Sequence, residues 1–273
     1  MFVGTYLTMK IKKSSQRPRP EFVTLDALEM WLACRLRWKL TRDQPPDAEP
    51  PPWEHLQKCI LESVYFYHRE RSRLGRMYFP RVQEHFWEAF ERQSLAASNR
   101  YLHPWDRAKD MRFGESVLEQ YVAVANAQAK DCIGQNCAWS IRVPGAKLPL
   151  HVPADLLYSE KPVRVQVVRT APDPELAQFH LAPWAAAITA AHQVHCGCPP
   201  KQLEAVFLVA EESPQVVRLT IPPPPPETMA KLRLWLTAYA SGLARDDIFP
   251  QPGSHCGYCP FRVPCARWPG KTK

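Results

Sequence analysis

Hydrophobic positions recur with helical spacing through the first half of the chain. After Thr24, whose hydroxyl can cap a helix, leucine and tryptophan side chains return every three or four residues as far as Leu36. Five prolines between Asp43 and Pro52 end this first helix. Three further segments have the same period, and the sequence therefore predicts helices over Trp53–Tyr78, Val82–Ala97 and Glu115–Ala129.

After residue 130 the apolar period shortens to two, which is typical of strands. Two such segments meet at Pro144-Gly145, a hairpin-like turn, and a valine-rich run follows them. The predicted strands are Trp139–Val143, Leu148–Tyr158, Val163–Val168, Ala205–Val209 and Val216–Ile221, and the predicted later helices are Glu175–Val194 and Glu227–Leu243. Helices, three strands, a helix and two strands predict one mixed α/β core with a helical region before it.

These elements divide the chain into four parts. Residues 1–22 form a basic arm with the composition of a flexible segment, and residues 23–130 form the helical region. Residues 131–245 form the α/β core, and residues 246–273 form a cysteine-rich loop and tail.

The C-terminal loop carries the densest chemical pattern in the sequence. Cys256, Cys259 and Cys265 follow C-x2-C-x5-C spacing, with aromatic residues and prolines between them. Three thiolates presented by one tight loop form a ligand set for a soft metal ion or an iron–sulfur cluster. A tetrahedral zinc ion or a cubane cluster needs a fourth donor, and Cys34, on the polar edge of the first predicted helix, is the best-placed candidate. The alternative is a set of ordinary buried thiols.

A second group of donors is weaker. His192, His195, Cys196 and Cys198 are enough ligands for zinc, but adjacent residues rarely both reach one ion, and the glycine and prolines that follow indicate a helix-to-strand turn. The three other cysteines are most simply core or incidental thiols: Cys59, Cys132 and Cys137.

Composition narrows the class of protein and of partner. No apolar run approaches about 18 residues and no signal-type segment is present, so the nine cysteines indicate reduced thiols in a cytoplasmic protein without a membrane part. The net charge of +8 favours a polyanionic partner. Residues 1–112 hold a surplus of six positive charges and the remainder a surplus of two, so a nucleic-acid surface is expected mainly on the N-terminal half.

The basic residues at the ends of the first two predicted helices are candidates for phosphate contact. Cations near a helix C-terminus also complement the helix dipole, and both interpretations stay open. The candidates are Arg35, Arg37, Lys39, Arg69, Arg71, Arg73 and Arg76.

A cysteine in an early helix, a βββαβ core and a closing PxPGxxCxxCxxxxxC tail together resemble the RecB-like branch of the PD-(D/E)XK nuclease superfamily. Its iron–sulfur members include AddB-type nuclease domains and the nucleases of CRISPR spacer acquisition. The resemblance covers about Leu25 to Cys265 and implies a restriction-endonuclease-like mixed β-sheet core. It also implies a [4Fe-4S] cluster, with zinc as the alternative, on Cys34, Cys256, Cys259 and Cys265. Such relatives usually have proline after the first cysteine, where this chain has Arg35.

The resemblance also supplies a catalytic pattern, which this sequence alters. Such nucleases gather two acids and a lysine, often with a histidine, around divalent cations. Asp155 matches the first acid, but the next strand reads VRVQVVRTA, with Gln166 or Val167 near the second acid and Arg169 in place of the lysine. An amide brings no negative charge and a guanidinium cannot act as a base, so magnesium or manganese is not expected there.

The helix expected before the core is altered as well. Its best match to the family pattern, EHLQKCILE, puts Lys58 at the histidine position, although His55 lies nearly one turn earlier and could replace it. Gln178 matches the helix-borne glutamine of these enzymes loosely.

Three functions are consistent with these sequence features. The first is a DNA-binding, catalytically inactive nuclease-fold protein that binds single strands or duplex ends within a multi-subunit DNA-processing or genome-defence (CRISPR-type) assembly. The second is an active magnesium- or manganese-dependent exonuclease that takes its missing acid from Glu160, Asp173 or Glu119. The third is a zinc-containing subunit that only bridges other proteins.

Overall fold

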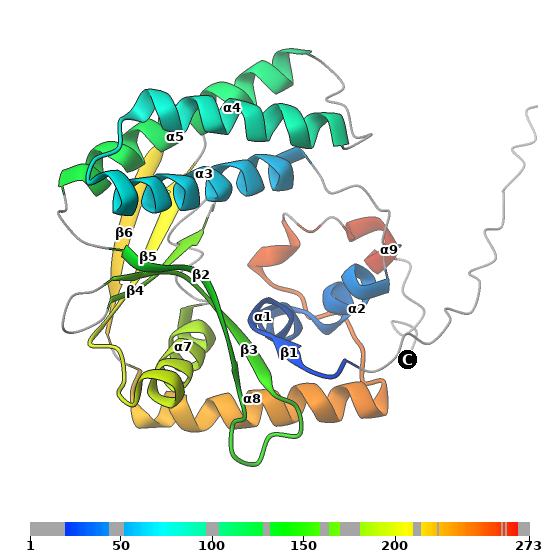
Figure 1. Cartoon of the computed structure of the whole chain (residues 1–273). Coiled ribbons are helices and arrows are strands. Elements are labelled where there is room, and N and C mark those ends of the chain that lie inside the picture. Colours follow the sequence, from blue (N-terminus) through cyan, green and yellow to red (C-terminus); the bar gives the residue numbers. More distant parts are fainter. Residues whose placement is uncertain are drawn as a thin grey trace, which may run out of the picture.

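The computed structural model describes residues 20–43, 52–96, 104–127, 132–158, 164–169, 181–209, 214–222, 224–257, 259 and 261–266. Nearly all of the predicted basic arm lies outside these residues. Within them, helices pack on a mixed β-sheet from both sides (Figure 1). None of the described helices is both long and apolar enough to span a membrane.

The N-terminal elements are β1 (Val23–Thr24), α1 (Leu25–Ala33) and α2 (Arg35–Asp43). The Thr24 hydroxyl accepts a hydrogen bond from the backbone N–H of Ala27 at 3.1 Å, so the predicted helix cap is confirmed. One continuous helix was expected here, and that expectation is wrong. The chain breaks at Cys34, whose backbone is extended (φ −161°, ψ 111°), and a second helix begins directly after it.

Three long helices form a layer of their own: α3 (Pro52–Leu74), α4 (Phe79–Ala96) and α5 (Pro104–Ala127). They correspond to the three predicted helices, but α5 begins about ten residues before Glu115. Its first turns are polar and lack an apolar stripe, which explains the short prediction. Arg107 holds this part against α4 by an ion pair with Glu91 and by lying over the Phe90 ring.

The described strands form one six-stranded sheet in the order β1-β3-β4-β5-β6, with β2 paired to β3. The β1–β3 and β4–β5 pairs are parallel and the others are antiparallel. The helix α7 (Leu181–Cys196) connects β4 to β5, and α8 (Pro226–Arg245) follows β6. The larger strands are β2 (Cys132–Ile141), β3 (Leu150–Tyr158), β4 (Arg164–Arg169), β5 (Gln202–Val209) and β6 (Gln215–Ile221).

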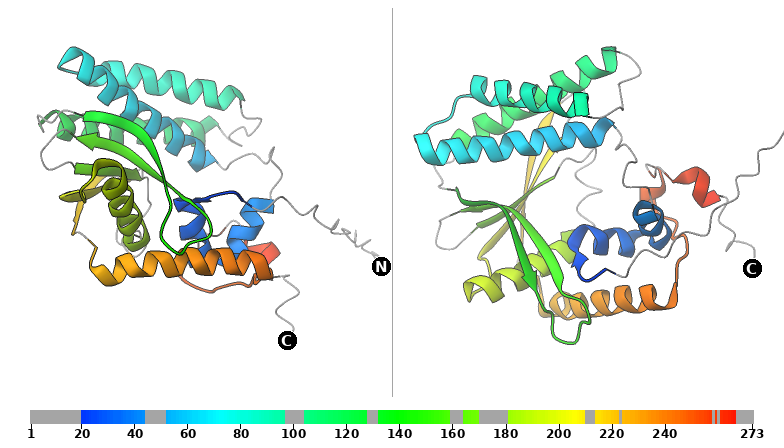
Figure 2. Two further views of the ribbon diagram at one scale, coloured as in Figure 1. Left: turned by 60° about the horizontal axis from the view of Figure 1, so that its bottom comes forward. Right: turned by 45° about the vertical axis from the view of Figure 1, so that its right-hand side comes forward.

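Two apolar clusters divide the helices of the first half of the chain. The α3–α4–α5 layer packs on the ends of β3 and β5 through Phe86, Tyr121 and Leu156. The helices α1 and α2 instead join α7 and α8 around Trp31 and Trp184. Figures 1 and 2 show the two groups on opposite sides of the sheet. Cys34, which lies between α1 and α2, is therefore on the side of the sheet that α7 and α8 cover, away from the α3–α4–α5 layer.

A buried polar contact joins the helical layer internally. His68 of α3 is almost fully buried, and its Nε2 lies 2.7 Å from the hydroxyl of Tyr121 on α5. The pKa of His68 is lowered to about 3, chiefly by burial and to a smaller extent by the positive charges of Arg71 and Arg218. The imidazole is therefore neutral in the folded protein at neutral pH.

This histidine makes folding stability depend on pH. Below pH 6.5, the ordinary pKa of histidine, the unfolded chain binds a proton at this residue and the folded chain does not. The contribution of His68 to the free energy of unfolding is therefore fully present above pH 6.5 and decreases towards pH 3. We expect the His68 contribution to the free energy of unfolding to decrease by about 2 kcal/mol from pH 6.5 to pH 5. Urea unfolding of wild type and His68→Gln at both pH values measures it, because acidic groups affect both proteins alike. Equal pH dependence in the two proteins would contradict the assignment.

Candidate metal centre and nuclease-like site

Cys34 occupies the N-cap of α2. Its Sγ accepts a hydrogen bond from the backbone N–H of Arg37 at 3.5 Å, and its carbonyl accepts one from Trp38 at 3.0 Å. The first turn of a helix has unpaired N–H groups and a partial positive charge, which stabilise an anionic group placed beside them. A thiolate at Cys34 would meet such an environment.

The three C-terminal cysteines are held by short backbone turns. Cys256 closes a 3-10 turn, η1 (Ser254–Cys256), and its N–H donates to the carbonyl of Gly253 at 3.0 Å. Cys259 donates to the Cys256 carbonyl at 3.4 Å. Cys265 belongs to α9 (Arg262–Ala266), and its N–H donates to Phe261 at 2.8 Å. The loop is thus folded back on itself around the three thiols.

All four cysteines line one cavity of about 330 Å³. Figure 1 and both views of Figure 2 show α9 beside α2, although the two segments come from opposite ends of the sequence. Leu36, Leu40 and Phe261 supply apolar wall, while Arg37 and Arg262 supply positive charge. The structure therefore brings together the residues that were selected from sequence as one ligand set.

Polar contacts fasten the start of α2 to the segment before the cysteine loop. The backbone N–H of Arg35 donates to Gln251 Oε1 at 3.1 Å across 216 positions of sequence, and the N–H of Leu36 donates to the Phe249 carbonyl at 3.2 Å. The Arg35 guanidinium bonds Asp247 at 2.5 Å and lies 4.5 Å from the Phe249 ring centroid. We call this set of contacts the clasp.

The clasp accounts for the departure from the family pattern at Arg35. This residue is the first of α2, a position where proline is also favoured because its N–H is not needed within the helix. Here the N–H is used, since Gln251 accepts its hydrogen bond. Proline at this position would lose that hydrogen bond, so the clasp favours a residue with a backbone N–H.

The sulfur atoms are free thiols in this structure. Across the described ranges, no three His, Cys, Asp or Glu side chains are gathered closely enough to hold a metal ion. The four cysteines therefore share a cavity without forming a compact single-ion site.

Asp155, the acid expected of a nuclease site, is buried on β3. Its Oδ1 accepts a hydrogen bond from the hydroxyl of Tyr65 on α3 at 2.6 Å. The carboxylate thus lies at the contact of the sheet with the helical layer. Tyr65 was not among the residues predicted for this site. The one sequence signal for it is its position seven residues after Lys58, which places both on the same face of a helix.

The backbone register shows which position on β4 lies beside Asp155. Leu157 pairs with Val165 and Leu156 with Gln166, and the paired region ends there, one residue short of Asp155. Gln166, opposite the neighbour of Asp155, is therefore the paired β4 position nearest to the acid along the backbone. Arg169 ends β4.

Three of the remaining catalytic candidates lie on the described helices α3 and α5. Lys58 is exposed on α3, and Glu119 is exposed on α5. His55 is half-buried, with both ring nitrogens lacking a hydrogen-bond partner. Gln178, Glu160 and Asp173 lie outside the described residues.

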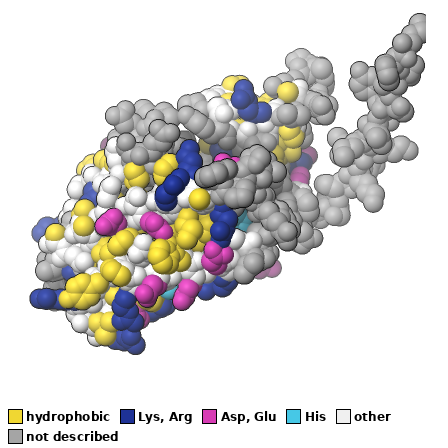
Figure 3. All heavy atoms as spheres, turned by 90° about the horizontal axis from the view of Figure 1, so that it is seen from above, with side chains coloured by type: hydrophobic (Ala, Val, Ile, Leu, Met, Phe, Trp, Pro, Cys, Tyr) yellow, Lys and Arg dark blue, Asp and Glu magenta, His cyan; other side chains and the backbone are white. Residues whose placement is uncertain are grey.

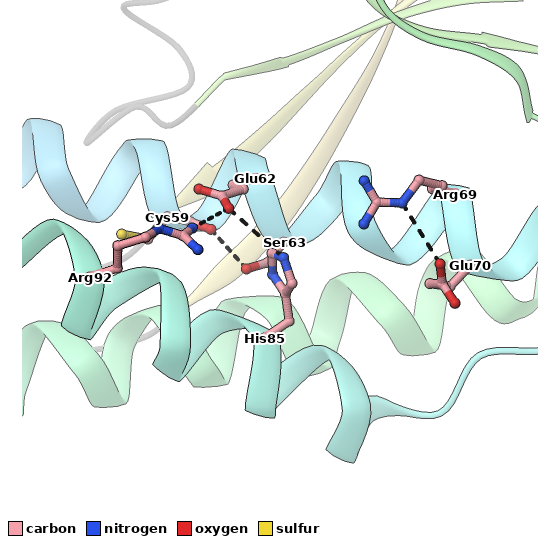
Figure 4. A network of polar contacts seen from close by, with 7 residues as sticks. All are labelled: Cys59, Glu62, Ser63, Arg69, Glu70, His85 and Arg92. Carbon is pink, nitrogen blue, oxygen red and sulfur yellow. Dashed lines mark hydrogen bonds and ion pairs between the residues drawn. The ribbon is translucent and has the colours of Figure 1, made fainter.

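Glu62, the acid at the end of the EHLQKCILE segment, is directed to the neighbouring helix. It bonds Arg92 of α4 and lies 3.9 Å from His85 Nε2 (Figure 4). Burial lowers the pKa of His85, so Arg92 is the charged partner of this carboxylate near neutral pH. Glu62 thus stabilises the α3–α4 contact.

Most of the cations proposed for phosphate contact have partners within the protein. Arg35 belongs to the clasp, and Lys39 pairs with Asp246 at 3.3 Å. Arg71 turns inward and donates to the Tyr67 hydroxyl at 2.9 Å. Glu70 pairs with Arg73 at 2.5 Å and with Arg69 at 3.7 Å. Figure 4 draws the Arg69–Glu70 pair.

Two candidate cations differ from this group. Neither Arg37 nor Arg76 has an ion-pair partner among the residues that the structure describes. Figure 3, which views the molecule from above, shows basic, acidic and apolar side chains interspersed on this face. Of the seven candidate cations, Arg37 and Arg76 are therefore the two whose charge is not paired within the described residues.

The other thiols lie away from the cavity. Burial raises the pKa of Cys59 to about 12 and of Cys132 to about 11, which keeps both protonated. Cys196 and Cys198 are exposed, while His192 is buried with Nδ1 2.6 Å from the Cys198 carbonyl. That contact closes the predicted turn between α7 and β5.

Comparison with known proteins gives a likeness of fold. No protein-family model matches the sequence, and no curated protein is similar to it. A candidate exonuclease from Eubacterium rectale superposes with a TM-score of 0.51 and 9% identity, over 94% of this chain and 93% of that chain. The structure of SSO0001 gives a TM-score of 0.46 and 12% identity, over 95% of this chain and 91% of that chain. The protein has a nuclease-like mixed α/β fold, as predicted.

Proposed function

We propose that this protein binds DNA on a nuclease-like fold whose catalytic site has degenerated, and that its four cavity cysteines hold a structural [4Fe-4S] cluster. It would serve as a subunit of a DNA-processing or genome-defence assembly. The observation that carries the proposal is the single cavity lined by Cys34, Cys256, Cys259 and Cys265. The fold likeness to a candidate exonuclease supports a nucleic acid as the ligand.

The size of the cavity supports a cluster over zinc. Four thiolates about 2.3 Å from one zinc ion lie about 3.8 Å from each other in a tetrahedron. A cubane places an iron atom beneath each thiolate and therefore needs more room between the ligands. The four cysteines line one cavity of about 330 Å³, which suits the larger group. When bound, the cluster would link α2 to the C-terminal loop.

The surroundings of Asp155 support the loss of cleavage. Two-metal or one-metal hydrolysis needs clustered carboxylates to fix the cation. Asp155 accepts a hydrogen bond from Tyr65, and it is the one carboxylate in the sequences of β3 and β4. One carboxylate on these two strands is a poor site for a hard cation.

Labelled oligonucleotides test this function directly. We expect the anaerobically purified protein to bind single strands or duplex ends at low salt without cleaving them in Mg²⁺ or Mn²⁺. Because most cations are paired internally, only about two phosphates should be neutralised, so affinity should fall about tenfold between 50 and 200 mM salt. Fluorescence anisotropy measures the binding, and gel electrophoresis measures cleavage.

The alternatives predict different results. DNA cleavage that disappears in Asp155→Ala would show an active nuclease. Failure to bind any DNA at low salt, with stoichiometric zinc in a colourless protein, would favour the protein-bridging function.

A further inference from the structure

The turn between α3 and α4 holds an aromatic ring out in solvent. The helix α3 ends at Leu74, and Gly75 follows in the left-handed conformation (φ +75°), with its N–H bonded to the Arg71 carbonyl at 2.8 Å. Three residues later the side chain of Tyr78 is 66% exposed, and that of Leu74 is 49% exposed. Neighbouring exposed apolar side chains, unlike single ones, are typical of surfaces that bind a ligand or partner.

Hydrogen bonds and a buried side chain hold the backbone of this turn in place next to Tyr78. The Met77 side chain is buried in the helical layer, and its carbonyl accepts a hydrogen bond from Asn126 Nδ2 of α5 at 3.1 Å. Asn126 Oδ1 in turn accepts one from the Tyr67 hydroxyl at 2.8 Å. The N–H of Arg81 donates to the Tyr78 carbonyl at 3.2 Å. A ligand that stacks on Tyr78 would meet a preorganised support.

The turn also borders an open hollow of about 530 Å³. Six residues line it: Leu74, Gly75, Arg76, Met77, Tyr78 and Arg81. The volume is within the range of small-ligand sites, so it can admit one nucleotide.

The two arginines of the hollow give it positive charge. Arg76 and Arg81 are exposed, and neither has an ion-pair partner in the described part of the chain. They differ in this from Arg71 and Arg73, one turn earlier, whose guanidinium groups are engaged. Two unpaired cations beside a stacking surface are complementary to a phosphate-linked aromatic group.

We propose that this turn binds an unpaired nucleotide of single-stranded nucleic acid, with the base stacked on Tyr78 and the flanking phosphates bound by Arg76 and Arg81. The inference rests on the proposed DNA binding and adds the form of the ligand. Bases within a duplex are already stacked on each other, so the ring discriminates in favour of a single strand or a frayed end. An acidic protein segment would use the arginines but gain little from the ring.

Fluorescence anisotropy with a labelled 20-nucleotide single strand and the matching duplex tests the proposal. Tyr78→Ala is expected to weaken single-strand binding about tenfold and to leave duplex binding nearly unchanged. Tyr78→Phe should bind like wild type, because it keeps the ring. Arg76→Ala combined with Arg81→Ala should weaken binding and reduce the salt slope by about two, whereas Arg112→Ala, an exposed arginine on α5, serves as the matched control.

The outcomes separate this inference from the broader function. If wild type binds DNA and Tyr78→Ala binds the single strand equally well, the stacking site is wrong and the DNA-binding function stands. If wild type binds no DNA at low salt, the proposed function itself fails. Competition by polyglutamate that equally affects wild type and Tyr78→Ala, with no preference for the single strand, would assign the turn to an acidic protein partner instead.

Discussion

Cys34→Ser is expected to lose most of its iron and sulfide. Wild-type protein purified without oxygen should be brown and contain about four irons and four sulfides per chain, because the proposed cubane has this composition. Serine keeps the size of the side chain but removes the soft thiolate that the cluster requires. Since the cluster would join α2 to the C-terminal loop, we expect Tm to fall by about 10 °C, equivalent to about 3 kcal/mol for a chain of this size.

Cys196→Ser is the matched control. Cys196 is exposed at the end of α7 and does not line the cavity, so its replacement should leave iron, sulfide and Tm unchanged. Metal analysis, visible absorption and thermal unfolding of the three proteins give the result. Full iron content in Cys34→Ser would remove this residue from the ligand set. One zinc ion per chain in a colourless wild type would replace the cluster by zinc.

Gly242→Ala is expected to destabilise the protein by about 2–3 kcal/mol. In most helices this change stabilises by about 1 kcal/mol, because alanine restricts the unfolded chain. At Gly242 of α8, however, an added Cβ would overlap the Trp31 ring. Trp31 cannot easily move, since it packs edge-on against Trp38 and Tyr239, with ring centroids 5.2 and 5.3 Å away.

Chemical unfolding in urea measures this effect. Ser241→Ala, the neighbouring position on α8, is the control for helix propensity and should be neutral or slightly stabilising. A Gly242→Ala protein as stable as wild type would show that α1 and α8 are less tightly packed than described. Because Trp31 lies one turn before Cys34, we also expect Gly242→Ala to bind the cluster less firmly.

Much of the fold could be predicted because local patterns agree with the tertiary structure. The Thr24 cap, the turn at Gly145 and the presence of strands β2 to β6 along the chain follow from capping, turn and alternation rules. The strand β1 could not be found, because two residues carry no period. The break at Cys34 was also missed, since the helix start after it donates hydrogen bonds to Gln251 and Phe249, more than 200 positions away.

The grouping of the four cysteines around one cavity could be predicted from sequence, but the residues that surround them could not. Cysteine spacing is a strong local signal, and the three C-terminal cysteines with Cys34 do line one cavity. Which of the candidate cations are paired within the protein could not be predicted from sequence, because the partners of Arg35 and Arg71 come from distant elements. Likewise, the alternative of Gln166 or Val167 beside Asp155 needed the register of β4, which periodicity alone does not define.

The clasp has a consequence for synthesis on the ribosome. Cys34 emerges early, whereas Gln251 and Cys256 are added more than 200 residues later. At a translation rate of about 5–20 residues per second, the nascent chain exposes this thiol for roughly 10–40 s before its partners exist. Oxidation or capture of Cys34 during that interval would leave a finished chain whose two ends cannot be joined.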